Sequence, residues 1–478
     1  MMTLPARTQP NVPTTRMRSL AFGAAILALA ARLPFIGSPG YTEDLAQFVA
    51  WAEISREGSR IAPPGGLPMV YAERPGGSGR SWSNYPPGYL IVLRGLATIH
   101  DSIAPEPERL SLDLIRRIRS GADDSGVRRA MWIFKGPAVI ADAVIAALLL
   151  LWVSRRLDER SAVVTGVVYA LAPPIIWDSA AWGQVESVFI LPLLLAIEMG
   201  SRGRVEAMAF WASTAFMVKA QAAMMAPLAL LLAWQYAGTD GRRWARVALA
   251  AIVPAAAIAL PFLSQSDGLW RAYAGAAEYY PFTHLNGFSA WFLTSPILSP
   301  QLETMASSYS RDTLPLFGGM SARVIGGALL MGSWIVVGVR LLRGRCGGGV
   351  LQWAVAVLPI SFFAFSTQMH ERYIVPAVAM WLWAFSNDRR WWLGFGVILL
   401  VSTLNLLWVW PGTGDGEWVA FWRSVLHRNW LTLAPGQWCA SAITFLAFLM
   451  LVIGPNDRRR AQVALDVTRS ERDTAVAP

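Results

Sequence analysis

The sequence predicts an all-α, polytopic membrane protein with about 12 transmembrane helices and with interfacial helices in its outer loops. The chain of 478 residues is 54% hydrophobic and only 15% charged, and its mean hydropathy is +0.40. This composition excludes a soluble multidomain enzyme. Apolar stretches close to the length of a membrane-spanning helix recur along the chain, and its 23 Trp suit a protein with many membrane–water interfaces.

Cysteine spacing and charge distribution exclude further classes of function. Cys346 and Cys439 stand far apart and have no zinc, redox or disulfide spacing. The net charge of +10 comes from Arg residues in short clusters between apolar runs. Such clusters indicate membrane topology and not a nucleic-acid interface. We therefore expect a lipid bilayer as a partner and no nucleic acid.

The chain opens with a polar N-terminal segment at 1–18, which contains three Arg residues, followed by an apolar stretch at 19–36. The apolar stretch is either a signal peptide with a cleavage site near Ala28–Ala30 or an uncleaved first membrane helix. We favour the uncleaved helix, because cleavage would cut the chain just before the acidic stretch described below. The Arg residues on its N-terminal side predict a cytoplasmic N-terminus.

Region 37–130 is predicted to be a long outer loop, and 264–320 a second one. The first loop holds candidate interfacial helices at Tyr41–Trp51 and Tyr89–Ile99, separated by a Gly/Pro-rich stretch. The other spans are predicted at about 133–153, 161–177, 187–200, 205–218, 220–236, 245–263, 321–342, 350–366, 373–386, 391–410 and 437–454. Residues 19–455 then form one transmembrane domain, and 456–478 form a basic cytoplasmic tail.

The Arg clusters agree with this map of spans. After residue 130 every short cluster falls in a loop predicted to be cytoplasmic, as the positive-inside rule requires. The clusters are Arg155–Arg156, Arg202 with Arg204, Arg242–Arg243, Arg343 with Arg345, Arg389–Arg390 and Arg458–Arg460. Polar residues of motif-like segments fall at the opposite, outer ends of the spans. We therefore expect a protein of the cytoplasmic (inner) membrane whose active site opens on the extracytoplasmic side.

The stretch Tyr41–Trp51, YTEDLAQFVAW, carries two adjacent carboxylates, Glu43 and Asp44. If it is helical, Asp44, Phe48 and Trp51 share one face, at i, i+4 and i+7. That face would lie in the membrane interface with a carboxylate at its leading edge. In the alternative interpretation, the carboxylates only favour a helix N-terminus.

Six ionisable residues are expected to share the outward-facing cavity: Asp44, Glu186, Lys219, His370, Glu371 and Arg372. An Asp or Glu suits a general base that takes a proton from an acceptor hydroxyl. Arg, Lys and His suit a leaving phosphate, whose growing negative charge needs cations already in place. A base on one side of the sugar and cations on the other are what inverting sugar transfer from a lipid-linked monophosphate donor needs. Lys219 adds weight, because Lys135 and Lys219 are the only lysines in an Arg-rich chain.

Each of these residues also has a structural interpretation. Glu186 can cap the helix that follows Gly183, and Lys219 can be a snorkelling residue at a helix end. The segment His370–Arg372 can be a solvated turn in which Glu371 pairs with its neighbour. Tyr85–Gly88 reads as a turn, because Pro-Pro-Gly restricts the backbone.

Five segments occur in order along the chain: NYPPGYL at 84–90, WGQVES at 182–187, KAQAAMMAPL at 219–228, LNGFSAWFL at 285–293 and MHERYIVPA at 369–377. In combination they resemble the C-type-fold glycosyltransferases of the membrane. The resemblance is closest to the dolichyl-phosphate-glucose glucosyltransferases of asparagine-linked glycan assembly and their prokaryotic relatives. It extends over about 35–385. Glu186 departs from it, since relatives often have Asp at that position, and so does the long, Gly/Pro-rich first outer loop.

The resemblance implies the C-type fold and a polyprenyl-phosphate-linked sugar donor, with no metal and no other cofactor. It implies that Asp44 is the catalytic base and that His370 and Arg372 bind the donor phosphate, with Lys219 beside them. Six further polar residues are expected to bind substrate: Glu43, Tyr85, Gln184, Glu186, Gln221 and Glu371.

The sugar and the acceptor stay open at this point. The acceptor is a lipid-linked glycan, another cell-envelope glycan, a glycolipid or, as in a protein O-mannosyltransferase, a protein side chain. A different class of function is a lipid-glycan transporter or flippase. A transporter would place its polar groups at mid-membrane in two matching halves, and the sequence shows neither feature.

Overall fold

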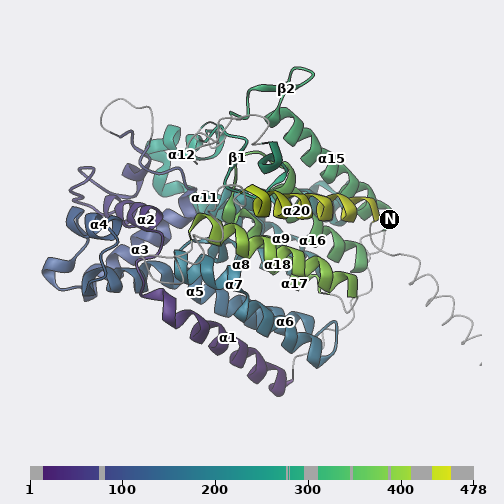
Figure 1. Ribbon diagram of the computed structural model, residues 1–478, viewed down its shortest axis with the longest axis horizontal. Coiled ribbons are helices and arrows are strands. Elements are labelled where there is room, and N and C mark those ends of the chain that lie inside the picture. The colour runs from purple at the N-terminus through teal and green to yellow at the C-terminus, as the bar shows by residue number, and fades with distance from the viewer. Residues whose placement is uncertain are drawn as a thin grey trace, which may run out of the picture.

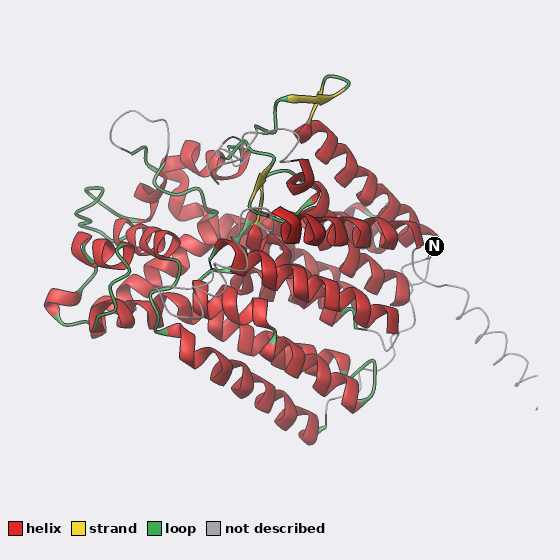
Figure 2. Ribbon diagram, viewed as in Figure 1, coloured by secondary structure: helices red, strands yellow, loops and turns green. Residues whose placement is uncertain are grey.

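The computed structural model describes residues 14–74, 81–275, 278, 280–294, 311–344, 348–385, 389–410 and 433–453. Figure 2 shows that helices make up most of this structure and that strands are few and short. The predicted all-α architecture is confirmed, and several of its helices are long and apolar enough to cross a membrane. Residues 1–13, Cys346 and the tail at 456–478 lie outside the described residues, so the predictions made for them are not addressed.

The first membrane helix, α1 (Thr15–Ile36), packs along α5 (Ser125–Val153) and α6 (Glu159–Leu171) (Figure 1). Ala21, Ala24 and Ala28 are buried on one face of α1, and such small side chains let helices approach closely.

An ion pair joins α1 to α5 inside the bundle. Arg32 and Asp142 are both fully buried, and Nε of Arg32 donates to Oδ2 of Asp142 at 2.7 Å. The hydroxyl of Tyr169, on α6, donates to the other carboxylate oxygen at 2.9 Å. A buried charge between apolar helices needs such partners. The network therefore fixes α1 as part of the bundle.

The remaining helices of the bundle follow in chain order (Figure 1). They are α7 (Pro173–Ile176), η3 (Trp177–Trp182), α8 (Glu186–Ser201), α9 (Val205–Val218), η4 (Ala220–Met225), α10 (Ala226–Ala237), α11 (Gly241–Ala259), α15 (Ala322–Arg343), α16 (Gly348–Phe365), α17 (Val375–Trp383), α18 (Arg389–Val409) and α20 (Leu433–Ile453). Every predicted apolar segment overlaps one of these helices or α1, α5 or α6.

Fewer of these helices than expected are long enough to cross a bilayer alone. Within the described residues, six helices have the necessary length and apolar character, or up to seven if one bent pair counts as a span. That pair replaces the predicted span 161–177: α6 ends at Leu171, and the chain continues at 43° through Pro173–Trp182. Proline lacks the N–H and restricts the preceding residue, so the Ala172-Pro173-Pro174 sequence breaks the helix. α17 has only nine residues.

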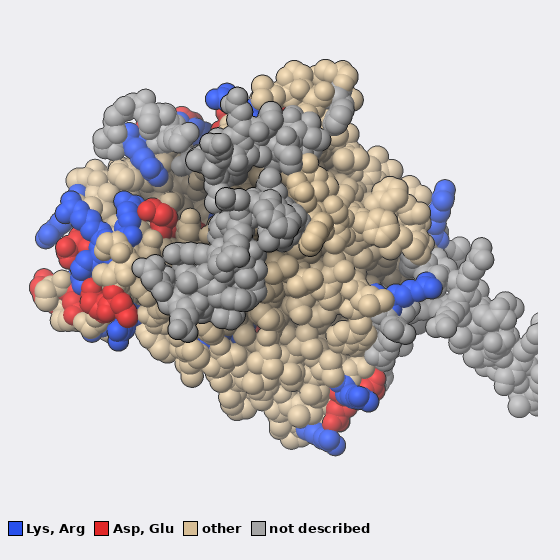
Figure 3. Space-filling view, in the orientation of Figure 1, with Lys and Arg blue, Asp and Glu red and all other residues tan. Residues whose placement is uncertain are grey.

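Charge is distributed as a membrane requires. Figure 3 shows Lys, Arg, Asp and Glu at the ends of the bundle, with a broad band between them that carries almost none. Large apolar side chains are exposed on the outer helices, among them Phe22, Leu249, Ile252, Ile335 and Phe445. So many exposed apolar side chains fit contact with lipid chains.

The first outer region, 37–130, contains 11 Arg and 11 Asp or Glu residues and so carries no net charge. Many of these form ion pairs, such as Arg56 with Asp101 at 2.7 Å and Arg128 with Asp123 at 2.6 Å. The Arg excess of the protein is therefore not located in this region, in agreement with its assignment to the outer face.

Both helices predicted in this region form, as α2 (Thr42–Ile54) and α3 (Pro87–Ile103); η1 (Leu67–Tyr71), η2 (Glu106–Glu108) and α4 (Leu112–Arg119) complete the region. Pro87 occupies the first position of α3, where its missing N–H costs nothing. Gly88 is required by packing, because a Cβ there would lie 2.6 Å from the carbonyl oxygen of Met217 at the end of α9. The Pro-Pro-Gly turn thus lets α3 pack closely against the end of α9, beside Lys219.

One expectation about α2 is wrong. Phe48 and Trp51 are not in a membrane interface: they are 2% and 3% exposed and pack with Tyr85 and Tyr89. Their ring centroids lie 5.3–5.7 Å from those of the two tyrosines. The spacing that places aromatic residues on one helix face is the same for lipid contact and for protein contact, and only packing distinguishes them.

The second outer region, predicted at 264–320, contacts the bundle through a short pair of strands. It contains η5 (Leu260–Gln265), α12 (Ser266–Ala274), β1 (His284–Leu285), η6 (Ala290–Thr294), β2 (Pro315–Phe317) and β3 (Met320–Ser321). β1 pairs in parallel with β4 (Met369–His370), just after α16. The buried Asp312 reinforces this contact by accepting hydrogen bonds from Thr367 and Gln368 at 3.0 and 2.8 Å. These contacts hold the HERY segment against the outer region.

The arrangement predicts which residues face the cell exterior. In a protein whose native cysteines are replaced by Ala, we expect an impermeant thiol reagent to label Ser120→Cys, at the end of α4, in intact cells. Thr239→Cys, at the exposed join of α10 and α11, should be labelled only after permeabilisation. Labelling of Thr239→Cys alone in intact cells would place the outer regions in the cytoplasm.

Candidate functional site

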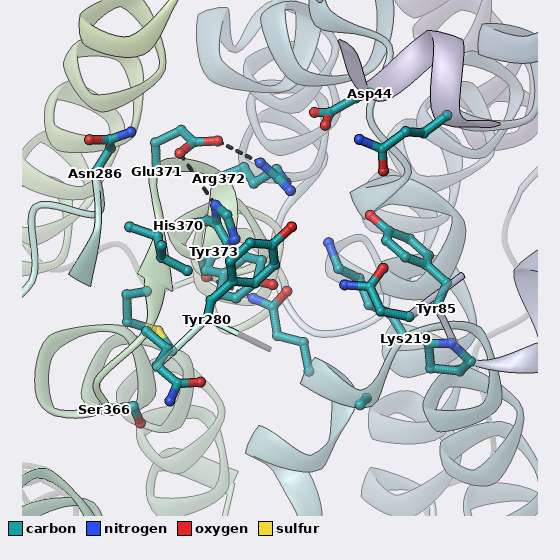
Figure 4. A pocket seen from close by; sticks show the side chains of 18 of the residues that line it. Asp44, Tyr85, Lys219, Tyr280, Asn286, Ser366, His370, Glu371, Arg372 and Tyr373 are labelled. Carbon is teal, nitrogen blue, oxygen red and sulfur yellow. Dashed lines mark hydrogen bonds and ion pairs between the residues drawn. The ribbon is translucent and has the colours of Figure 1, made fainter. Parts of the chain in front are cut away.

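A cavity of about 580 Å³ lies where α2, the NYPPG turn, η4 and the segment 366–373 meet (Figure 4). Seven of the predicted site residues line it: Asp44, Tyr85, Lys219, Gln221, His370, Glu371 and Arg372. A cavity of this size suits a small-molecule substrate. Residues from distant parts of the sequence thus meet in one place, as predicted.

Asp44 lines the cavity from the first turn of α2, and Phe48 and Trp51 line it from the same helix face. Its Oδ2 accepts a hydrogen bond from Nε1 of Trp182 at 3.0 Å and another from the Gln184 amide. Within the described residues, no cation lies at ion-pair distance from Asp44. Neutral donors therefore orient this carboxylate without neutralising it.

The turn that holds these two donors depends on Gly183. The π-helical turn η3 ends there with φ at +93°, a conformation that favours glycine. The N–H groups of Gly183 and Gln184 both donate to the carbonyl oxygen of Asp178, at 3.1 and 2.8 Å. A Cβ on Gly183 would lie 2.9 Å from a methyl of Leu45, on α2. Close contact between the turn and α2 brings Trp182 and Gln184 within reach of Asp44.

Glu186 lies behind the cavity wall and joins two cations. It is fully buried, and its Oε1 contacts the ammonium of Lys219 and lies 3.7 Å from Nε of Arg372. Glu186 does begin α8, but it is also an ion-pair partner and does not line the cavity. Lys219 does not snorkel to the surface; it is buried at the end of α9, with the Tyr373 ring centroid 5.1 Å away.

The segment His370–Arg372 forms the facing wall of the cavity (Figure 4). Nη1 of Arg372 donates to Oε1 of Glu371 at 2.6 Å, and Nδ1 of His370 lies 3.7 Å from Oε2. The pairing of Glu371 with Arg372 is therefore real, but both residues are buried and are not part of a solvated turn.

Protonation differs among these residues. Burial raises the pKa of Glu371, but the Arg372 guanidinium and His370 outweigh it and hold that pKa at about 2. Burial and the nearby Arg372 lower the pKa of His370 below its usual 6.5. His370 is therefore neutral near pH 7, and the positive charge of the site comes from Lys219 and Arg372. Burial, with the charge of Asp44, raises the pKa of Tyr41 to about 12, so its hydroxyl stays protonated.

Besides Glu186, two predicted substrate-binding residues do not line the cavity, Glu43 and Gln184. Glu43 is exposed and pairs with Arg119 at 3.4 Å, away from the cavity. Gln184 acts through Asp44. Gln221 does line the cavity, but its amide donates to the carbonyl oxygen of Tyr373 at 2.9 Å and so supports the facing wall.

Several polar lining residues were not anticipated: Tyr41, Gln47, Asn84, Tyr280, Asn286 and Gln368. A signal existed for Gln47, which follows Asp44 by three positions on α2, and for Asn84, which begins the NYPPG segment. No sequence pattern links Asn286 and Gln368. Both have φ at +65°, and they meet through the pairing of β1 with β4.

Among the residues that the structure describes, no group of three or more His, Cys, Asp or Glu side chains is placed to hold a metal ion. Comparison of the chain with family models and with curated proteins finds no match.

The charges around Glu186 lead to a prediction about stability. Lys219→Met should leave Glu186 buried with reduced compensation and destabilise the protein by about 3–5 kcal/mol. In a Glu186→Gln background the same change should cost much less, because the carboxylate is gone. Thermal unfolding of the four proteins in detergent gives the coupling energy. Equal costs of Lys219→Met in both backgrounds would show that the pair is not coupled.

The pKa of Glu371 leads to a prediction about pH. Because its folded-state pKa of about 2 lies below the usual 4.5, folding favours the charged form. This contribution is complete above about pH 4.5 and is lost as the pH falls towards 2. The melting temperature of Glu371→Gln should therefore be well below that of the wild type at pH 6, and the gap should narrow below pH 4.5. A gap that is constant from pH 6 to about pH 3 would contradict this assignment.

Proposed function

We propose that this chain is an inverting glycosyltransferase that moves a hexose or similar sugar from a polyprenyl-phosphate-linked donor to an acceptor hydroxyl. The observation that carries the proposal is the composition of the cavity. Asp44, an oriented carboxylate with no ion-pair partner among the described residues, faces the cations Lys219 and Arg372 across a space lined by aromatic and amide side chains. The resemblance of five sequence segments to C-type-fold glycosyltransferases supports the same activity.

The proposed reaction assigns a role to each wall. The acceptor oxygen attacks the anomeric carbon from the side of Asp44, which takes the hydroxyl proton. The bond between that carbon and the phosphate oxygen breaks on the opposite side, so the configuration inverts. The phosphate leaves with an additional negative charge beside Arg372 and Lys219, and the neutral His370 is placed to donate a hydrogen bond.

The position of the cavity suits a lipid-linked donor. Glu186 is the first residue of α8, and Arg202 directly follows its last residue. Arg343 is likewise the last residue of α15, at the end away from the outer region. The cavity thus lies at the ends of the helices opposite to the Arg clusters. A polyprenyl chain would remain in the bilayer while its phosphate reaches Lys219 and Arg372. We propose accordingly a C-type fold with about 12 spans in the cytoplasmic membrane and an extracytoplasmic active site.

The acceptor within this proposal is a lipid-linked or other cell-envelope glycan. Besides Asp44, the amide side chains of Gln47 and Asn84 line the cavity. Amide side chains of this kind suit hydrogen bonds to sugar hydroxyls. A hydroxyl of a protein side chain or of a glycolipid would give its proton to the same base. The assay described next therefore decides which acceptor is used.

The critical experiment concerns Asp44. Membranes containing each variant at matched expression are incubated with polyprenyl-phosphate glucose or mannose and a membrane glycolipid extract, and labelled products and donor binding are measured. Asp44→Asn keeps the size and one hydrogen-bond acceptor but cannot take the proton. We therefore expect the rate to fall by about 10²–10⁴-fold while donor binding survives. Asp44→Glu should lose about 10²-fold, because the base is displaced by about 1 Å.

Glu43→Gln is the matched control, since Glu43 is adjacent, exposed and outside the cavity. It should transfer sugar at close to the wild-type rate. An active Asp44→Asn beside an inactive Glu43→Gln would assign the base to the other carboxylate. Full activity of both would leave α2 as a structural helix only. Absence of transfer by the wild type with any donor would refute the proposed activity.

A further inference from the structure

Lys135, on α5, is the second of the two lysines and takes no part in the proposed chemistry. Its side chain is fully buried, and within the described residues its ammonium makes five contacts, all with carbonyl or hydroxyl oxygens. The carbonyl oxygens of Ser38 and Ala180 are both 2.8 Å away, that of Ala181 is 3.1 Å away and that of Phe35 is 3.3 Å away. The Ser38 hydroxyl is 3.4 Å away.

These acceptors belong to two helix ends. Phe35 and Ser38 lie at the C-terminal end of α1, and Ala180 and Ala181 lie in the last turn of η3. Carbonyl groups at such ends lack the N–H donors of a following helical turn and carry the negative end of the helix dipole. The Phe35 carbonyl also accepts from the Ser38 hydroxyl at 2.7 Å. One ammonium therefore joins two helix ends that are far apart in the sequence.

Both helix ends lead directly to Asp44. The chain continues from Ser38 to Tyr41, which precedes α2, and from Ala181 to Trp182 and Gln184, which donate to Asp44. The two segments are also hydrogen-bonded to each other, because the N–H of Tyr41 donates to the carbonyl oxygen of Trp182 at 3.0 Å. Movement at either helix end would therefore change the position of Asp44 or of its donors.

The contact between the ends of α1 and η3, called the joint below, is tightly packed. Gly40 has φ at +69°, and a Cβ there would lie 2.6 Å from the carbonyl oxygen of Trp182. A Cβ on Gly183 would lie 3.1 Å from Cε of Lys135. A compact ammonium with three donors fits between these backbones, whereas a planar guanidinium is wider and directs its donors in one plane. This explains a Lys in a chain that otherwise uses Arg almost throughout.

We propose that Lys135 is a positioning residue for Asp44. It holds the ends of α1 and η3 together, so that the Asp44 carboxylate stays within hydrogen-bond distance of its two donors. This inference rests on the proposed function for its effect on turnover, but not for its effect on structure. Lys135 does not line the cavity and touches no expected substrate.

The structural test uses hydrogen–deuterium exchange of the protein in lipid nanodiscs. In Lys135→Met we expect the amides of Tyr41, Gly183 and Gln184 to exchange about tenfold faster or more, since hydrogen bonds to a charged group contribute at least that factor to local stability. Lys135→Gln, which keeps a shorter NH₂ donor, is the milder variant and should show an intermediate effect. Unchanged exchange in both variants would overturn the inference, whatever the transfer assay gives.

The functional test separates positioning from general destabilisation. Lys135→Met should lower kcat by about 10²-fold with little change in the KM for the donor, because the cations that hold the phosphate are on other elements. Lys135→Arg should not restore the rate. Trp353→Phe is the control: it removes a buried donor to a carbonyl, that of Met450 at 3.1 Å, at the α16–α20 contact. It should change neither kcat nor exchange at the joint.

The outcomes distinguish this inference from the proposed function. A wild type that transfers no sugar refutes the function, and the exchange experiment then decides the role of Lys135 alone. A Lys135→Met protein with faster exchange but wild-type kcat would show that the joint does not position Asp44. Equal losses of kcat in Lys135→Met and Trp353→Phe would reduce Lys135 to a residue that only stabilises the fold.

Discussion

The neutralisation of one buried carboxylate, that of Glu186, organises the cavity. Glu186 has no solvent exposure, and it is stabilised by Lys219 at the end of α9 and by Arg372 after α16. Removing a charge from water costs several kcal/mol unless partners are close. The three segments must therefore stay together, and their assembly leaves the two cations at the cavity wall, where they can also meet an anionic ligand.

The opposite wall is built on a different principle. Asp44 is held by hydrogen bonds from Trp182 and Gln184 and has no ion-pair partner among the described residues. Its position depends on backbone geometry, at Gly183 and at the carbonyl oxygens that Lys135 joins. An ion pair holds a carboxylate by neutralising it, whereas neutral donors hold it and leave its charge available. The two walls thus differ in the way that the proposed base and the proposed phosphate-binding groups require.

The bilayer explains why these groups gather at one end. Apolar side chains cover the lipid-facing helices, and charge is nearly absent from the band between the two ends of the bundle (Figure 3). Between the apolar helices α1 and α5, Arg32 and Asp142 are paired and fully buried, as isolated charges are too costly there. Polar side chains gather at the helix ends and in the regions that cover them, where the proposed lipid-linked substrate would bring its polar head.

The amino-acid sequence alone was enough to predict the helical membrane architecture, the helix that carries Asp44 and the meeting of Lys219 with His370–Arg372. These features follow from local properties: apolar run length, helical periodicity and the side of the membrane on which Arg accumulates. Other features depended on packing between segments distant in the chain. Packing buried Phe48 against Tyr85 instead of lipid, and it lowered the pKa of His370. It also surrounded Lys135 with carbonyl groups from two helix ends. Periodicity shows which face of a helix a residue occupies, but only the folded chain determines what that face meets.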